Sequence, residues 1–204
     1  MKKTGIVLGI FILFSLSLSV FQSCCHPDPI YFRLDALQSE AQRITGITVS
    51  GTQDIGNFDV EPYVPDEKGI RYDSLGIDVT NELITAMNQT EWNSNFGFSS
   101  AYACSPAEHY DMVFEVIITS SEDYNSAYPK GANLEEVMLV RNAHMVRGNN
   151  VALFMANRQL MYHSVFYTFS FPPSENKIHD LTIKYILTDG REYETTIKDL
   201  FIRK

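Results

Sequence analysis

The strongest constraint on the fold of this chain is a pair of alternating segments joined by Asp189 and Gly190. Apolar and polar residues alternate through residues 179–188, which is the pattern of a half-buried β-strand. The Asp-Gly pair tolerates the positive φ angles of a tight hairpin turn, and residues 191–202 return with similar alternation. Near Asp199 the alternation shifts, so we expect a β-bulge or a strand end there. The chain therefore closes on a predicted β-hairpin.

Other strand patterns precede this hairpin. Apolar residues alternate through residues 165–171 and stop before Pro172 and Pro173, which cannot donate to a sheet ladder. Residues 71–84 suit one face of a strand, although 81–87 alone would also suit a helical turn. Further strands are predicted at residues 31–37, 44–50, 98–104 and 112–119, and short helices at residues 132–138 and 149–157.

About seven strands separated by turns predict a mainly β protein. The hydrophobic content of 45% and the aromatic content of 12% are typical of a packed domain. The favoured architecture is an antiparallel, immunoglobulin-like β-sandwich with one or two short helices, and the alternative is a strand-rich α+β sheet. We expect residues 31–204 to form one such domain.

The first residues have the pattern of an export signal. Lys2 and Lys3 precede an uncharged, mostly apolar stretch at residues 5–21, which is at the short edge of the roughly 20 apolar residues that a spanning helix needs. Ser23 then stands directly before Cys24, and this junction resembles the lipobox of bacterial lipoproteins. The alternatives are an uncleaved membrane anchor and an ordinary secretory signal.

The lipobox resemblance implies cleavage after Ser23 and acylation of Cys24 with fatty-acid chains such as palmitate. Residues 1–23 are then the signal peptide and residues 24–30 a tether, which Pro27 and Pro29 keep extended. Several acyl chains hold a domain stably on a membrane, because each buried CH₂ contributes about 0.8 kcal/mol. The expected location is the cell envelope at the outer membrane, facing either the periplasm or the surface.

The charge of the chain argues against nucleic acid as a partner. The full sequence has 16 basic and 25 acidic residues, a net charge of −9. Removing residues 1–23 removes Lys2 and Lys3 and no acid, which leaves 14 − 25 = −11. Such a domain repels a polyanionic backbone.

The three cysteines leave one question open. With Cys24 acylated, Cys25 and Cys104 remain, and the envelope is an oxidising compartment. These two cysteines form either one disulfide or a free Cys25 and a buried Cys104. Their spacing fits neither a Cys-x-x-Cys redox pair nor a zinc knuckle.

The sequence contains no catalytic or cofactor motif that we recognise. No two of the five histidines have the i, i+2 or i, i+4 spacing that presents metal ligands, so we expect ordinary loop or surface histidines. A Gly-x-Ser-x-Gly elbow, a P-loop and a Gly-x-Gly-x-x-Gly sequence are all absent. The sequence therefore predicts a protein that is not an enzyme, with no catalytic residue, no metal site and no cofactor.

Residues 120–131 are the clearest candidate for a binding loop. Tyr124 and Tyr128 are expected to be exposed there, and amphipathic rings suit contact with a sugar or a peptide. Trp92, in a polar stretch, is a second candidate aromatic platform. The alternative for the loop is a polar turn closed by Pro129 and Gly131. Glu122, Asp123 and Asn125 of the same loop offer oxygen ligands for a calcium ion. Their order departs from that of the EF-hand loop, which argues against this calcium hypothesis.

The whole chain resembles an uncharacterised family of Bacteroides-group lipoproteins of about this length. The resemblance rests on Ser23-Cys24-Cys25, on residues 101–106 and 117–120, on Tyr128-Pro129-Lys130-Gly131, and on the closing hairpin. It implies a lipoprotein of unknown function and transfers no catalytic residue. Asp73-Ser74-Leu75 is similar to the O-glycosylation acceptor of exported proteins in this group, which makes Ser74 a candidate glycosylation site.

These observations favour a membrane-anchored binding module with a glycan or an envelope protein as its partner. The alternatives are a structural accessory subunit of an envelope complex and an unrecognised hydrolase. An apolar pocket with converging carboxylates would favour the hydrolase.

Overall fold

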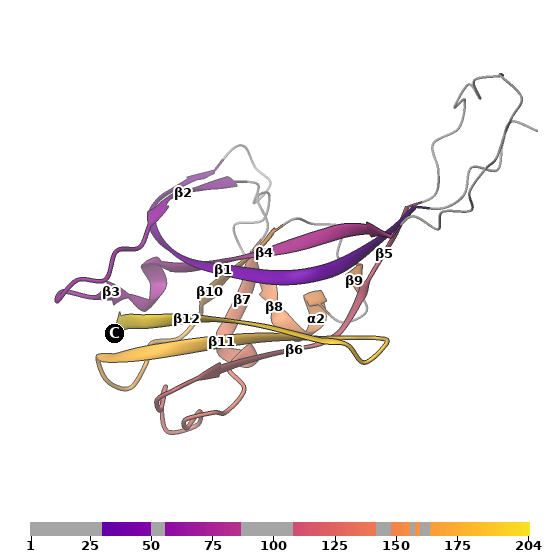
Figure 1. The fold of residues 1–204 in the computed structure, drawn as a ribbon. Helices are drawn as coiled ribbons and strands as arrows, with labels where there is room; N and C mark the ends of the chain where they lie inside the picture. Colours follow the sequence, from indigo (N-terminus) through magenta and orange to yellow (C-terminus); the bar gives the residue numbers. More distant parts are fainter. Residues whose placement is uncertain (1–29, 50–55, 87–107, 142–147, 156–157, 160–163) are drawn as a thin grey trace, which may run out of the picture. The chain divides into compact units, whose positions relative to one another are not determined.

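The computed structural model describes residues 30–49, 56–86, 108–141, 148–155, 158–159 and 164–204 (Figure 1). The chain divides into two compact units, although the sequence predicts one domain from residue 31 onward. The first unit contains residues 1–32 and 85–109, and within it Tyr31 stacks on His109 with ring centroids 5.1 Å apart. The second unit contains residues 33–84 and 110–204.

Two β-sheets form a sandwich-like arrangement (Figure 1). The seven-stranded sheet has the order β2-β1-β4-β10-β7-β8, with β5 paired to β1. Its strands are β1 (Ile30–Val49), β2 (Gly56–Pro62), β4 (Leu75–Ala86), β5 (Glu108–Tyr110), β7 (Met138–Arg141), β8 (Asn149–Asn150) and β10 (Ser164–Phe169).

The five-stranded sheet has the order β3-β12-β11-β6-β9. Its strands are β3 (Ile70–Arg71), β6 (Met112–Ser120), β9 (Arg158–Gln159), β11 (Lys177–Leu187) and β12 (Glu192–Arg203). The short β3 pairs with β12 in parallel, whereas β12, β11, β6 and β9 pair antiparallel. The prediction of a mainly β sandwich is confirmed.

The C-terminal hairpin forms as its sequence predicts. β11 pairs with β12 in antiparallel register, and Gly190 adopts a φ of 84° in the turn. The register shifts between His179 and Leu181, opposite Asp199, which has a φ of 59°. The Asp180 carboxylate accepts the Asp199 N–H at 3.0 Å and stabilises this left-handed residue. The predicted bulge is confirmed.

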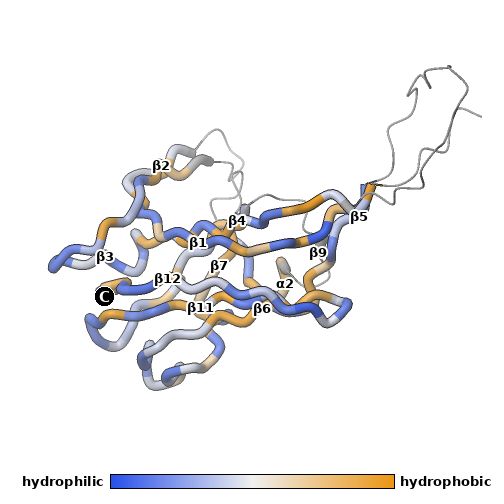
Figure 2. The backbone as a smooth tube through the Cα atoms, in the orientation of Figure 1, coloured by the Kyte–Doolittle hydropathy of each residue, from blue (hydrophilic) through white to orange (hydrophobic). Residues whose placement is uncertain are grey.

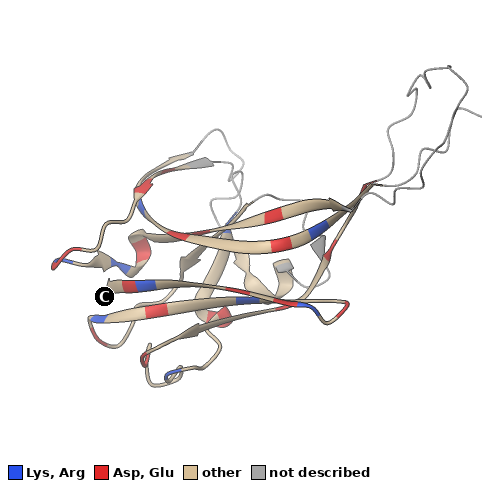
Figure 3. Ribbon diagram, in the orientation of Figure 1, with Lys and Arg blue, Asp and Glu red and all other residues tan. Residues whose placement is uncertain are grey.

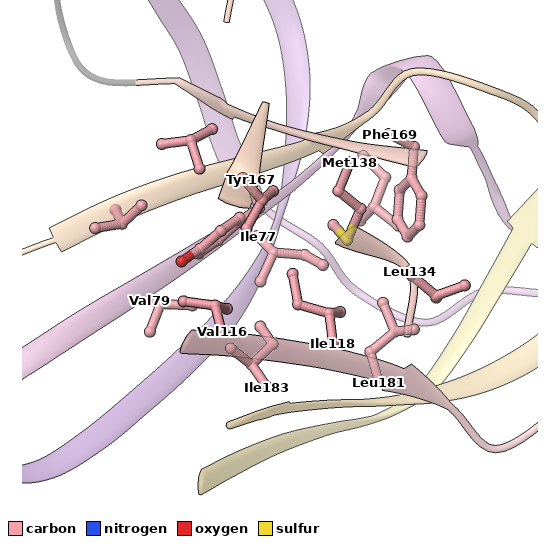
Figure 4. Packing of buried hydrophobic residues seen from close by; sticks show 14 of the residues in the cluster. Ile77, Val79, Val116, Ile118, Leu134, Met138, Tyr167, Phe169, Leu181 and Ile183 are labelled. Atoms are coloured by element: carbon pink, nitrogen blue, oxygen red, sulfur yellow. The ribbon is translucent and has the colours of Figure 1, made fainter. Parts of the chain in front are cut away.

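The core lies between the sheets because each strand turns its alternate apolar residues inward. Figure 2 shows this alternation of hydropathy along the strands. The fully buried Tyr167 of β10 and Tyr185 of β11 place their hydroxyl oxygens 2.6 Å apart and so join the sheets. Figure 4 shows side chains from both sheets packed together, among them Ile77, Val79, Val116, Ile118, Tyr167, Leu181 and Ile183.

Strand β1 is one continuous element, whereas the sequence predicts separate strands at residues 31–37 and 44–50. The residues between these two segments continue the strand because the side chains that face inward find hydrogen-bond or packing partners. The Ser39 and Thr195 hydroxyls are hydrogen-bonded at 2.8 Å, and Ala41 packs against the core. Similarly, β4 continues through Ala86, so the helical alternative for residues 81–87 is wrong as far as residue 86. The strand predicted at residues 98–104 lies outside the described residues.

The two helix predictions need correction. Residues 132–138 form a single 3₁₀ turn, η2 (Glu135–Val137), which leads directly into β7. The Leu134 N–H donates to the Ile118 carbonyl at 2.7 Å, so this segment runs along β6 and does not coil. Of the described residues 149–155, α2 (Val151–Met155) is helical and residues 149–150 form β8, and the Asn150 side chain accepts the Leu153 N–H at the start of α2.

Candidate functional site

The predicted binding loop is held from inside by Tyr124. This side chain is fully buried, stacks on Phe169 with centroids 5.1 Å apart, and donates its hydroxyl to the Phe171 carbonyl at 2.7 Å. The expectation of an exposed Tyr124 is therefore wrong. The 120–131 segment bends back on itself, with the Tyr124 N–H bonded to the Tyr128 carbonyl, and this turn directs the Tyr124 ring into the core.

The polar groups of the same loop are bound by other groups of the protein. The Tyr128 hydroxyl donates to Glu136 at 2.6 Å, and this bond raises the Tyr128 pKa. Glu122 pairs with Lys177 at 3.1 Å. The other two candidate calcium ligands accept backbone N–H groups, Asp123 from Lys130 and Asn125 from Ala127 and Tyr128. The described residues contain no group of three metal-ligating side chains, so nothing in them supports the calcium hypothesis.

His179 is a core residue and not the loop or surface histidine that the sequence predicts. Its ring is fully buried, and its Nδ1 lies 2.8 Å from the Ser120 hydroxyl. Burial lowers the His179 pKa. Ser120 is itself only 4% exposed, so this Ser–His pair is closed to a substrate and is best explained as core packing.

Of the remaining predicted site residues, the structure describes Ser74 alone. Ser74 ends the 3₁₀ turn η1 (Tyr72–Ser74), is half-buried, and its hydroxyl donates to the Asp73 carboxylate at 3.2 Å. Cys24, Cys25, Cys104 and Trp92 lie outside the described residues, so their proposed lipidation, disulfide and binding roles stay predictions.

A better candidate site lies on the outer face of the seven-stranded sheet. Phe166 of β10 is paired with Asp78 of β4 on one side and with Arg141 of β7 on the other. Directly paired residues point to the same face of a sheet, and here that face is opposite to the one that carries Tyr167 into the core. We call Asp78, Phe166 and Arg141 the Phe166 row.

Arg141 is held at one end of this row. Its Nε donates to the Thr168 hydroxyl at 2.8 Å, and its guanidinium carbon lies 5.3 Å from the centroid of the Phe58 ring. The side chain is half-buried, and burial lowers its pKa. Arg141 forms no ion pair with any carboxylate of the described residues. Among the described residues, this half-buried cation is thus held in position without a counter-ion.

Asp78, at the opposite end, is a half-buried acid. Burial raises its pKa, a hydrogen bond from Ser164 lowers it, and the nearby Glu40 raises it further. Within the described residues the Asp78 Oδ1 atom is buried without a hydrogen-bond partner. Glu82, also on β4, is hydrogen-bonded to Gln38 of β1. Figure 3 shows acidic residues on β4 and a mixture of acidic and basic residues on β1.

The middle of the row is aromatic and apolar. The Phe166 ring lies over Gly76, where a Cβ atom would be 2.0 Å from the ring Cζ, so only glycine leaves room for it. Phe58 of β2 tilts against Phe166 with centroids 5.7 Å apart. Ile47 is paired with Phe58 across the β1–β2 hairpin and is 52% exposed. The row therefore combines a half-buried acid, an apolar centre and a half-buried base on the outer face of the sheet.

Sequence reasoning did not find this row, because its members lie on three strands that are far apart in the chain. The one available signal was Phe166, which interrupts the polar face of the β10 alternation. Comparison with protein-family models, curated proteins and solved structures finds no significant match to this chain. In the described residues no helix is long and apolar enough to cross a membrane.

Proposed function

We propose that this chain is a lipid-anchored protein of the bacterial cell envelope whose β-sandwich is a non-enzymatic binding module. The anchor is proposed from the signal-like residues 1–23 and from Cys24 in its lipobox-like setting. The binding surface is the outer face of the seven-stranded sheet, and the ligand carries an acidic group that Arg141 binds. The observation that carries this function is the guanidinium of Arg141, which Thr168 and Phe58 hold in position and which has no ion-pair partner in the part of the chain that the structure describes.

An acidic ligand follows from the energetics of that guanidinium. Taking a cation out of water without a counter-ion is unfavourable, and an arriving carboxylate compensates it. The Arg141 Nε donates to Thr168, and the guanidinium carbon lies over the Phe58 ring. The orientation of the guanidinium is therefore set before a ligand binds. The two terminal nitrogens form a planar pair of donors that matches a carboxylate. In a chain of net charge −9, such a cation is a selective point for an anion.

The binding function is tested by the NMR signal of the Arg141 Nε–H in the mature lipoprotein in detergent micelles. Titration with sodium acetate, against sodium chloride at equal ionic strength, should shift this signal saturably. Arg191 is the internal control, because Asp111 and Asp189 each lie 2.7 Å from its guanidinium and occupy it. An Arg141 signal that moves no more than that of Arg191 would refute the proposed site.

The anchor is tested separately by mass spectrometry of protein from the native membrane. An N-terminal Cys24 peptide that carries diacylglyceryl and acyl mass is the expected result. A Met1 terminus, or cleavage elsewhere without lipid, would overturn the anchor and leave the binding surface to be judged by its own experiment.

A further inference from the structure

The Phe166 row carries an acid and a base, and neither has an ion-pair partner among the residues that the structure describes. Asp78 and Arg141 stand on either side of Phe166, and no ion pair joins them. Directly paired residues on neighbouring strands have Cα atoms about 4.5 to 5.5 Å apart, so two steps separate the ends of the row by about 10 Å. Opposite charges at this separation on one face are complementary to a ligand that also carries two charges.

The groups that surround the two ends of the row differ. Glu40 acts on Asp78 and Glu82 lies on the same strand, so the β1–β4 side of the face attracts a cation. Arg141 is cationic and is backed by the ring of Phe58, so the β7 side attracts an anion. A purely anionic ligand would satisfy Arg141 and be repelled at the β4 end. A dipolar ligand satisfies both ends.

The centre of the row sets the chemistry of the middle of that ligand. Phe166 and Phe58 present aromatic surface there, and the exposed Ile47 lies beside Phe58. Half-buried apolar surface between two charged groups favours an apolar group in the ligand at the same place. The complementary order is therefore cation, apolar group, anion.

We propose that the Phe166 row binds a short extended peptide with both termini free, with its ammonium at Asp78 and its carboxylate at Arg141. This inference rests on the proposed function and names the ligand class of the same site. An extended chain spans at most about 3.3 to 3.6 Å per residue, so three residues match the 10 Å row. The side chain of the middle residue then packs on Phe166.

The experiment is isothermal titration of the full mature lipoprotein in micelles with Gly-Leu-Gly and two blocked forms. The N-acetylated peptide lacks the ammonium, and the C-amidated peptide lacks the carboxylate. Each block removes one charged contact, so each should weaken binding about tenfold or more. Gly-Ser-Gly, which replaces the apolar middle residue, should also bind more weakly than Gly-Leu-Gly.

Protein variants assign each end of the peptide to one residue. In Asp78→Asn the N-acetylated and free peptides should bind alike, while C-amidation still weakens binding. In Arg141→Gln the C-amidated and free peptides should bind alike. The matched controls are Glu194→Gln on the other sheet and Arg43→Gln, whose guanidinium faces Glu61 at 3.6 Å. Both controls should keep the affinity and both sensitivities, and circular dichroism checks that every variant is folded.

The outcomes separate this inference from the proposed function. If C-amidation weakens binding but N-acetylation does not, the anion site stands and the peptide assignment is overturned. If acetate shifts the Arg141 signal but Gly-Leu-Gly does not bind, the peptide class is likewise wrong. If neither acetate nor peptide reaches Arg141, both proposals fail.

Discussion

Tyr167 and Tyr185 provide the most stringent test of how the two sheets are held together. Both side chains are fully buried, and their hydroxyl oxygens lie 2.6 Å apart. Burial raises the pKa of both phenols, so both are neutral near pH 7. In the described residues the only hydrogen-bond partner of each hydroxyl is the other. The two hydroxyls are therefore expected to contribute to the free energy of unfolding as a pair.

The magnitudes follow from this mutual satisfaction. Tyr167→Phe or Tyr185→Phe alone leaves a buried hydroxyl unpaired, which should lower the free energy of unfolding by about 1 to 3 kcal/mol. The double variant removes both polar groups while keeping both rings, and its stability should lie within about 1 kcal/mol of the wild type. The sum of the single effects should thus exceed the double effect by about 1 kcal/mol or more.

Urea denaturation at 25 °C measures all four proteins, and equal m values would show that the unfolding transitions are comparable. Strictly additive single effects, or single variants as stable as the wild type, would contradict this account. Additivity would mean that each hydroxyl has a partner of its own and that the hydroxyl pair does not link the sheets.

Three further predictions concern single sites. Burial lowers the folded-state pKa of His179, so below the unfolded value of about 6.5 the unfolded chain binds the extra proton. The urea midpoint should therefore fall between pH 7 and pH 5, and it should fall less in His179→Gln. Tyr124→Phe keeps the stacked ring but removes the hydrogen bond to the carbonyl of the exposed Phe171, which should lower the free energy of unfolding by about 0.5 to 1.5 kcal/mol; an unchanged midpoint would contradict a stabilising role for this bond. Gly76→Ala places a Cβ against Phe166, so it should destabilise the protein by about 1 to 3 kcal/mol, and much less in a Phe166→Ala background, as thermal unfolding would show.

The parts of the fold that could be predicted from sequence are those in which local signals agree. The hairpin around Gly190 combines alternation with turn chemistry, and even the bulge at Asp199 was visible as a shift in the pattern. Strand β10 was visible because its alternate residues are strongly apolar. In each case the local sequence is enough to predict the element, and tertiary packing then stabilises it.

Other features depend on partners that lie far away in the chain. Tyr124 looks like an exposed loop tyrosine until the Phe171 carbonyl and the Phe169 ring are placed beside it. Residues 38–43 fall between two predicted strands, and the hydrogen bond between the Ser39 and Thr195 hydroxyls, which helps to join them into β1, depends on a strand far along the chain. The Phe166 row was missed for the same reason, since strand pairing alone brings its members together.

The position of β10 between β4 and β7 has a consequence for the order of assembly. β4 ends at Ala86 and β7 at Arg141, and neither pairs with the other directly. Until residues 164–169 have been synthesised, both strands keep an open edge, and open edges are prone to pairing with other chains. The central strand of the larger sheet thus becomes available only after both of its neighbours have been made.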